Sequence, residues 1–152
     1  MDLKRLALIA TLGSTAVLLG AYGFQHLGGM APCKLCLWQR WPHAAAILIG
    51  CLILLTNKLE LAWLGAIAAL STAAIGTYHV GVEQGWWEGP TSCTSSGVSN
   101  LSAQELMDQI LAAPLVRCDD ISWQLAGISM AGWNAILSVV LAVIWIQVAR
   151  RA

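Results

Sequence analysis

The sequence predicts an all-α integral membrane protein, a single domain (residues 1–152) built as a bundle of four transmembrane helices. Two observations support this fold class. Hydrophobic residues make up 58% of the chain and charged residues only 11%, against about 25% charged in a typical soluble domain. Four apolar segments are each long enough to cross a bilayer as a helix. Membrane lipid is therefore the expected surrounding, and a net charge of zero argues against a nucleic-acid partner.

The first apolar segment, residues 6–24, has no charged residue and follows Lys4 and Arg5. Its length of about 20 residues suits a helical membrane span. A cleaved signal peptide is the alternative interpretation. The residues that follow lack a small-x-small cleavage site and a second apolar segment comes soon after, so a retained span is favoured.

Three further apolar segments complete the predicted bundle. The second is interrupted early by Arg40, Pro42 and His43, and a turn at residues 57–60 separates it from the third. A long polar stretch precedes the fourth. The predicted spans are residues 6–24, 37–56, 61–80 and 128–148, joined on the outer side by loops at about 25–36 and 81–127.

The distribution of lysine and arginine predicts the orientation of these spans. Five of the eight lie on the side of the two termini, and three lie on the side of the long loops. The N- and C-termini are therefore predicted to be cytoplasmic. The five are Lys4, Arg5, Lys58, Arg150 and Arg151, and the three are Lys34, Arg40 and Arg117.

The eight tryptophans support the same layout. Six fall near the outer ends of the predicted spans, and Trp63 and Trp145 fall near the inner ends. Indole rings are amphipathic and favour the membrane interface, so we expect most of them to form interfacial belts.

The second outer loop contains a predicted short amphipathic helix at residues 101–113. Ser102 and Glu105 have the spacing of a capping box, and Pro114 ends the pattern. This helix is expected either to lie in the membrane interface or to pack on the top of the bundle.

Cys33 and Cys36 form a Cys-x-x-Cys pair between the first two spans. A structural zinc ion needs four ligands at close spacing, and 24 residues separate the other two outer cysteines, Cys93 and Cys118. Haem attachment needs a histidine directly after the second cysteine, where this chain has Leu37. The pair is therefore interpreted as a redox dithiol, and no metal is predicted.

The surroundings of Cys36 favour a thiolate. Cys36 lies near the start of the second predicted helix, where unpaired backbone N–H groups attract an anion. Arg40 follows one turn later on the same face. Both features stabilise a thiolate, which is the reactive form of cysteine. The alternative for Arg40 is an interfacial residue that extends its charge to water.

The remaining cysteines and the histidines indicate a function less specifically than the Cys-x-x-Cys pair does. Cys93 and Cys118 flank the polar part of the second loop, where a disulfide would be either a structural staple or a second redox pair that exchanges with the first. Cys51 lies within an apolar segment and is interpreted as a packing residue. The three histidines, His26, His43 and His79, lie near the outer ends of helices. Each is either a polar interface residue or a residue that binds a ligand or transfers a proton.

Two segments and the predicted topology resemble the bacterial DsbB family of disulfide bond formation proteins. Residues 24–26 (FQH), residues 32–36 (PCKLC) and Arg40 look like that family's first outer loop. The stretch from Cys118 to Trp133 resembles the one that begins at the family's last essential cysteine. The matching residues there are Cys118 to Trp123, Leu125, Gly127, Ser129, Met130 and Trp133.

The resemblance implies an enzyme of the bacterial inner membrane, a quinone-dependent thiol oxidase. Such a protein reoxidises a DsbA-like periplasmic oxidase of thioredoxin fold and passes the electrons to a quinone, either ubiquinone or menaquinone. By position, Cys93 would be attacked by the DsbA thiolate, and Cys118 would be its partner in the loop disulfide. Cys118 would then exchange with Cys33.

The quinone-binding residues that the resemblance implies are Cys36, Arg40 and His79. Cys36 would face the quinone as a thiolate, Arg40 matches the family arginine near the quinone, and His79 lies close to the position of a family histidine. Some family members have an acidic residue at the position of Gln39. Because glutamine is uncharged, no role in a charge pair is expected for it here. The family has a sister branch that acts with dedicated sulfotransferase-oxidising partners. The loop sequence does not distinguish this chain from that branch.

Two other functions compete with this one. A vitamin K epoxide reductase-like protein has a related chemistry, but there the Cys-x-x-Cys lies near the last helices, whereas here it follows the first. A non-catalytic membrane scaffold would use its disulfides only to staple its loops. Replacing Cys36 by serine discriminates, because a staple loses stability and an oxidase loses turnover.

Overall fold

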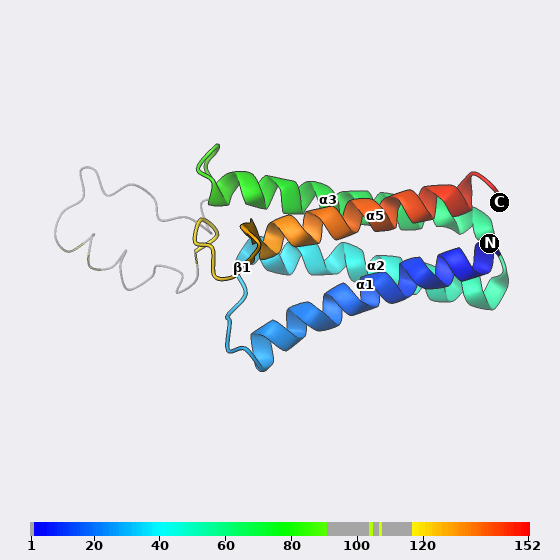
Figure 1. Cartoon of the computed structure of the whole chain (residues 1–152), viewed down its shortest axis with the longest axis horizontal. Helices are drawn as coiled ribbons and strands as arrows, with labels where there is room; N and C mark the ends of the chain where they lie inside the picture. Colours follow the sequence, from blue (N-terminus) through cyan, green and yellow to red (C-terminus); the bar gives the residue numbers. More distant parts are fainter. Residues whose placement is uncertain (1, 91–103, 105–106, 108–116) are drawn as a thin grey trace.

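The computed structural model describes residues 2–90, 104, 107 and 117–152, and its main feature is a bundle of four long helices (Figure 1). Each helix is long and apolar enough to cross a membrane, the third together with the short 3-10 helix η1 before it. This confirms the predicted fold class. The elements are α1 (Leu3–His26), α2 (Lys34–Thr56), η1 (Leu59–Leu61), α3 (Ala62–Glu83), β1 (Gln124–Leu125), β2 (Ile128–Ser129) and α5 (Met130–Ala149).

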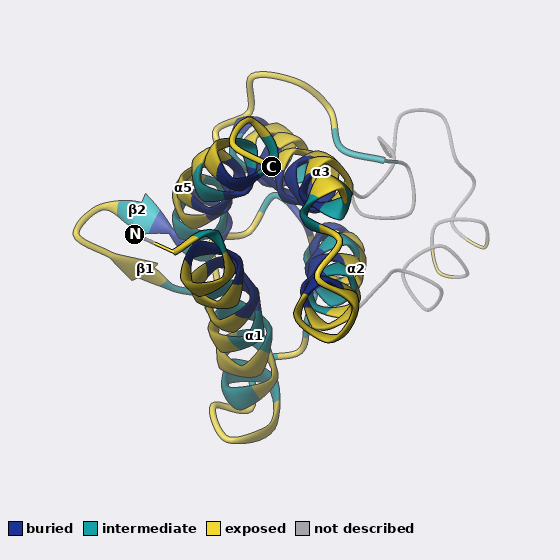
Figure 2. Ribbon diagram, turned by 90° about the vertical axis from the view of Figure 1, so that its right-hand side faces the viewer, coloured by how far each residue is buried: buried dark blue, intermediate teal, exposed yellow. Residues whose placement is uncertain are grey.

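The helices form a ring in the order α1, α2, α3, α5 when viewed along the bundle (Figure 2). Both termini lie at one end, which we call the terminal end (Figure 1). The connection between α1 and α2 lies at the opposite end, which we call the cysteine end because it carries Cys33. Toward this end α1 diverges from the other three helices (Figure 1).

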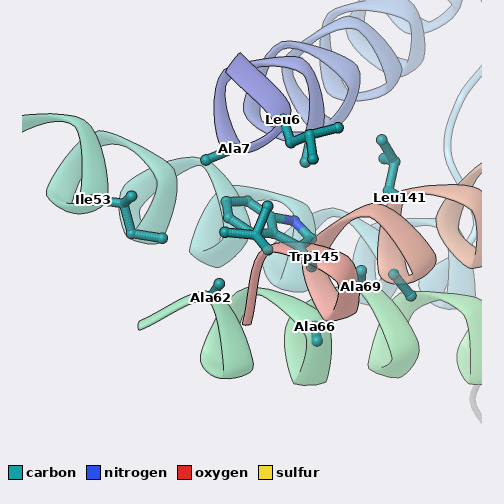
Figure 3. Close-up of a cluster of buried hydrophobic side chains, with 11 residues drawn as sticks. Leu6, Ala7, Ile53, Ala62, Ala66, Ala69, Leu141 and Trp145 are labelled. Atoms are coloured by element: carbon teal, nitrogen blue, oxygen red, sulfur yellow. The ribbon is translucent and has the colours of Figure 1, made fainter. Parts of the chain in front are cut away.

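The terminal end is filled by apolar side chains packed around Trp145 (Figure 3). Trp145 is fully buried between α1, α2 and α3, so it is a core residue and an exception to the lipid-facing belt expected for most of the tryptophans. A Cβ atom added to Gly65 would lie 2.7 Å from the indole ring, so only glycine lets α3 approach it this closely. Similarly, a Cβ at Gly50 would lie 1.9 Å from Thr11 Oγ1, where α1 crosses α2.

A small hairpin leads into α5. Gln124 pairs with Ser129 and Leu125 with Ile128. Ala126 and Gly127 connect the strands with φ angles of 54° and 77°, as the favoured two-residue hairpin turn requires. Because residues 128–129 belong to this hairpin, α5 begins at Met130, two residues later than predicted. The Ser129 hydroxyl caps it by accepting from the backbone N–H of Gly132 at 3.1 Å.

The second helix begins earlier than predicted, at Lys34 rather than at residue 37. The second helix ends at Thr56 as predicted, and the remaining helix ends differ from the predicted ones by one to three residues, as helix ends usually do. The predicted short helix at 101–113 lies outside the described residues, apart from Gln104 and Met107, which are helical. Large apolar side chains on the outside of the bundle suit a lipid-facing surface, among them Leu19, Leu48 and Leu55.

Candidate redox site at the cysteine end of the bundle

The Cys33–Cys36 pair forms the start of α2. Cys33 is the N-cap residue, and its sulfur accepts from the backbone N–H of Cys36 at 3.2 Å. The two sulfurs are 2.8 Å apart, with the Cys33 thiol donating to Cys36. This hydrogen bond and the burial of the side chain raise the pKa of the Cys33 thiol well above its usual value. The Cys33 thiol is therefore the donor of this pair, and the Cys36 sulfur is the acceptor.

Cys118 packs against this pair. It is fully buried in a small cluster with Cys33, Leu35 and Val82, which Cys36 also contacts. Cys118 is disulfide-bonded, whereas Cys33 and Cys36 are free, as is the exposed Cys51 within α2. The structure thus brings together three of the four predicted redox cysteines. The fourth, Cys93, lies outside the described residues.

His79 joins the cysteine pair to the interior of the bundle. This histidine of α3 is buried, and its Nε2 lies 3.6 Å from Cys33 Sγ. Its Nδ1 lies 3.0 Å from Gln39 Nε2, which also donates to the Leu35 carbonyl at 3.2 Å. Since a carbonyl only accepts, this end of Gln39 is the donating amide nitrogen, and His79 Nδ1 accepts from it. Neutral His79 therefore carries its proton on Nε2, facing Cys33.

Glu83 adds a buried carboxylate beside His79. Its side chain is 5% exposed, and its Oε1 lies 3.9 Å from His79 Nε2. Its other oxygen has no hydrogen-bond partner within the described part of the chain. The two residues are four positions apart, on one face of α3. Glu83 therefore supplies a proton acceptor next to the N–H group of His79.

Arg40 reaches across from α2 to α1. Its Nη1 donates to Gln25 Oε1 at 2.6 Å, its Nη2 lies 3.5 Å from the Ala21 carbonyl, and its guanidinium lies 4.7 Å from the centre of the Tyr22 ring. These contacts hold the guanidinium in one place. Its Nε is buried and lacks a partner among the residues described, so one donor is left for another group.

A cavity of about 310 Å³ opens where α1 diverges from the bundle. This volume lies at the lower end of the range of small-molecule sites. Much of its wall is apolar, and Cys36, Arg40, His43 and His79 are among its polar lining residues. Among the apolar lining residues are Val17, Ala21, Phe24, Met130, Trp133 and Leu137.

This cavity fits the ring of a quinone by its volume and the chemistry of its lining. Aromatic and aliphatic walls suit an apolar ring, and the guanidinium of Arg40 suits a carbonyl oxygen. All three predicted quinone-binding residues, Cys36, Arg40 and His79, line it.

The site also holds a set of atoms with the character of metal ligands. Cys33 Sγ, Cys36 Sγ and a nitrogen of His79 all lie within 4.8 Å of one another. Two thiolates and an imidazole are three of the four ligands that a structural zinc site uses. The absence of a metal stays a prediction.

Three polar residues of the site had no role in the sequence-based prediction. Gln39, Thr72 and Asn134 form a buried hydrogen-bonded group between α2, α3 and α5. Their signal in the sequence is a polar side chain within an apolar span, which is costly unless it is paired or functional. Glu83 follows the predicted end of the third span and so falls in the predicted second loop, whereas in the structure it is the last residue of α3.

Comparison with known proteins agrees with this site. The family model described as "Disulfide bond formation protein DsbB" matches residues 3–148. The chain is 29% identical to an uncharacterised protein of Rickettsia prowazekii over 91% of this chain and 83% of that protein. It is 27% identical to disulfide bond formation protein B of Albidiferax ferrireducens (97% and 91% covered) and 30% identical to that of Verminephrobacter eiseniae (86% and 77% covered).

The match of the family model covers nearly the whole chain, including all four helices and the connections between them. Membership in such a family implies a role in disulfide bond formation. The paired cysteines, the four-helix bundle and these comparisons lead to one conclusion: the chain is a multi-pass membrane protein that belongs to the DsbB family of disulfide bond formation proteins.

Proposed function

We propose that this protein is a quinone-dependent protein-disulfide oxidoreductase that reoxidises a DsbA-like oxidase and passes the electrons to a membrane quinone. The observation that carries the proposal is the position of Cys36. One side of Cys36 contacts the cysteine cluster that contains Cys118, and the residue also lines an apolar cavity with Arg40. A single sulfur is therefore next to both a disulfide partner and a space suited to an apolar acceptor.

The thiol side of the reaction follows from the cysteine cluster. A thiolate of the DsbA-like partner attacks Cys93 and displaces the Cys118 sulfur, giving a mixed disulfide. In the oxidised protein Cys33 and Cys36 form a disulfide. The Cys118 thiolate attacks Cys33 and displaces Cys36 as a thiolate, so that a Cys33–Cys118 disulfide forms. The second thiolate of the partner then releases the partner as its own disulfide, and the freed Cys93 thiolate attacks Cys118, which restores the Cys93–Cys118 disulfide and leaves Cys33 and Cys36 reduced. The burial of Cys118 against Cys33 supports this exchange, because the two residues already contact the same cluster.

The acceptor side depends on the cavity. A bound quinone supplies an apolar acceptor for two electrons that can diffuse in the membrane. Arg40 stabilises negative charge that builds up on an oxygen in the cavity, because the residue lines the cavity and its charged guanidinium is held in place by Gln25. The N–H of His79 stabilises negative charge on the Cys33 sulfur. The apolar lining residues exclude water from Cys36.

The orientation follows from charge and compartment. The excess of lysine and arginine at the terminal end favours cytoplasmic N- and C-termini in a bacterial inner membrane. The cysteine end then faces the periplasm, where disulfides persist and a soluble DsbA-like partner has access.

The proposal is tested with purified protein in detergent, a reduced DsbA-like protein and a soluble ubiquinone analogue, by following the absorbance of the quinone. We expect steady loss of quinone with the native protein and complete loss of turnover for Cys36→Ser and for Cys93→Ser. Cys51→Ser is the matched control, because Cys51 is an exposed free cysteine within the same helix as Cys36. It should turn over at the native rate.

Two results would contradict the proposal. If the native protein, with its cysteines confirmed as oxidised, consumes neither ubiquinone nor menaquinone analogues, it is not a quinone-linked oxidase. If Cys36→Ser only lowers thermal stability and keeps the native rate, the disulfides are structural staples.

A further inference from the structure

His43 is a buried titratable residue to which the proposed function gives no role. It lies on α2 seven residues after Cys36, which places it two turns deeper into the membrane on the same face. It is 2% exposed and lines the same cavity. An ionisable side chain at this depth is costly and is a functional candidate by default.

The hydrogen bonds around His43 have a fixed direction, and a backbone carbonyl sets it. The Leu35 carbonyl accepts from Gln39, so Gln39 Nε2 faces Leu35 and Gln39 Oε1 faces away. That oxygen lies 2.6 Å from the side chain of Asn134, which must therefore present its amide nitrogen, Nδ2. The same nitrogen donates to Thr72 Oγ1 at 3.2 Å, while the Thr72 hydroxyl donates to the backbone carbonyl of Gln39.

This direction continues to His43 and assigns its tautomer. With both hydrogens of Asn134 Nδ2 used, Asn134 Oδ1 accepts from His43 Nε2 at 2.9 Å. Ser138 Oγ lies 3.4 Å from the same ring nitrogen. Nε2 therefore carries the proton and Nδ1 has a free lone pair. His43 Nδ1 is buried and has no hydrogen-bond partner in the described parts of the chain.

Both buried histidines thus carry their proton on Nε2, and one group of amides fixes this tautomer in each. His79 keeps a proton on Nε2, the nitrogen near Cys33, and its Nδ1 is occupied by Gln39. In His43 the Nε2 proton is donated to Asn134, and Nδ1 is buried without a partner in the described parts of the chain; the residue lines the cavity. Of the two, His43 is the one whose unused nitrogen is able to take up and release a proton.

We propose that His43 is a further catalytic residue, whose Nδ1 carries a proton to a carbonyl oxygen of the quinone and then accepts a hydrogen bond from the quinol hydroxyl. This inference rests on the proposed function. The electrons and protons balance. Two electrons and two protons leave the Cys33 and Cys36 thiols as an S–S bond forms, and the same numbers convert a quinone into its quinol. His43 takes up one proton at Nδ1 and gives it up again, so it is unchanged after each turnover.

Other groups that line the cavity are less suited to this step. Arg40 stays protonated at any relevant pH, so it stabilises charge but does not donate its proton. Glu83 and His79 lie beside the cysteine pair, at the cysteine end of α3. His43 is two turns further along α2, so it serves a different part of the cavity from the groups around Cys36.

His43→Gln is the variant that tests the proposal. A glutamine amide still donates to Asn134, so the buried amide group remains satisfied, but the side chain has no titratable nitrogen. We expect kcat for quinone reduction to fall about 100-fold, the lower end of what a general acid contributes. The exchange between the reduced DsbA-like protein and the Cys118 disulfide, followed by thiol alkylation without quinone, should keep the native rate.

His26→Gln is the matched control, because His26 is exposed at the end of α1 and does not line the cavity. It should keep the native kcat. The His43 assignment is overturned if His43→Gln reduces quinone at the native rate while the native protein is active. If the native protein itself consumes no quinone, the proposed function fails, and the role of His43 fails with it.

A second measurement does not depend on activity. In protein labelled with ¹⁵N-histidine, the His43 signals, assigned by their loss in His43→Gln, should show a protonated Nε2 and a bare Nδ1. Addition of a soluble quinol analogue should shift the Nδ1 signal, because Nδ1 then accepts a hydrogen bond. A protonated Nδ1 in neutral His43, or no shift at saturating quinol, would contradict the proposal.

Discussion

The two ends of this bundle are built from the same four helices but are stabilised in different ways. At the terminal end, glycine and alanine let the helices approach closely around Trp145 (Figure 3). At the cysteine end, α1 diverges, a cavity opens, and the interior holds a hydrogen-bonded group centred on Gln39 and Asn134. One end is a packed core and the other is a polar site enclosed by membrane-spanning helices.

The unpaired polar atoms show what this difference means. Five buried side-chain atoms have no hydrogen-bond partner within the described residues. Three of them belong to cavity-lining residues, namely Arg40, His43 and Glu83. Unpaired buried polar atoms are costly, and their concentration around one cavity is expected where a ligand supplies the missing partners. Variants at the terminal end should therefore affect stability, and variants at the cysteine end should affect turnover.

The largest effect on stability is expected for Trp145→Ala. Removing this fully buried ring leaves a large cavity between four elements, which typically costs about 3–5 kcal/mol of unfolding free energy. The measurement is unfolding in detergent micelles, followed by circular dichroism. Trp63→Ala is the matched control, since Trp63 is 50% exposed at the same end and should cost far less. If Trp145→Ala instead lowers quinone turnover per folded molecule, the two ends are not independent.

A smaller effect, on turnover alone, is expected for Arg40→Met. The side chain keeps apolar contacts but loses the charged guanidinium of a cavity-lining residue, so kcat/KM for the quinone should fall about 100-fold. Arg150→Met, at the terminal end of α5, serves as its control and should have the native value. A native kcat/KM for the Arg40→Met variant would show that Arg40 does not act at the proposed quinone site.

The smallest effect is expected outside the bundle, at Arg117 and Asp119. The hydrogen bond from exposed Arg117 lowers the pKa of the Asp119 carboxyl. A lowered pKa stabilises the folded protein above the ordinary carboxyl pKa, and this contribution is lost as the pH falls through the lowered value. Arg117→Gln should therefore raise the pKa of Asp119 in an NMR titration and leave the melting temperature at pH 7 unchanged. A lower melting temperature at pH 7 would show that this pair stabilises the fold.

The fold followed from the sequence because it depends on length and hydropathy. A bilayer requires about 20 apolar residues for each helix, and four such segments are visible in the chain. The bundle interior was less predictable, because an apolar span does not reveal which face is buried. Trp145 is an example, since its position near a helix end suits an interfacial residue as well as a buried one.

The candidate site was predictable where the residue types are rare. The cysteine pair and Arg40 stand out against apolar neighbours, and the resemblance to a family supplied their expected roles. The amides were not predicted, because the partners of Gln39 come from α3 and α5, between 33 and 95 residues away. The tautomers of His43 and His79 depend on those contacts, so no local pattern contains them.

The most direct test of the account is a single turnover at the cysteine end alone. The variant Cys93→Ser/Cys118→Ser is reduced, freed of reductant and mixed with a ubiquinone analogue in a stopped-flow instrument. We expect one quinol formed and one Cys33–Cys36 disulfide gained per protein, with neither product when Cys36 is also replaced by serine. No quinol from a fully reduced, folded protein would contradict it, because the dithiol beside the cavity would then not be the donor to the quinone.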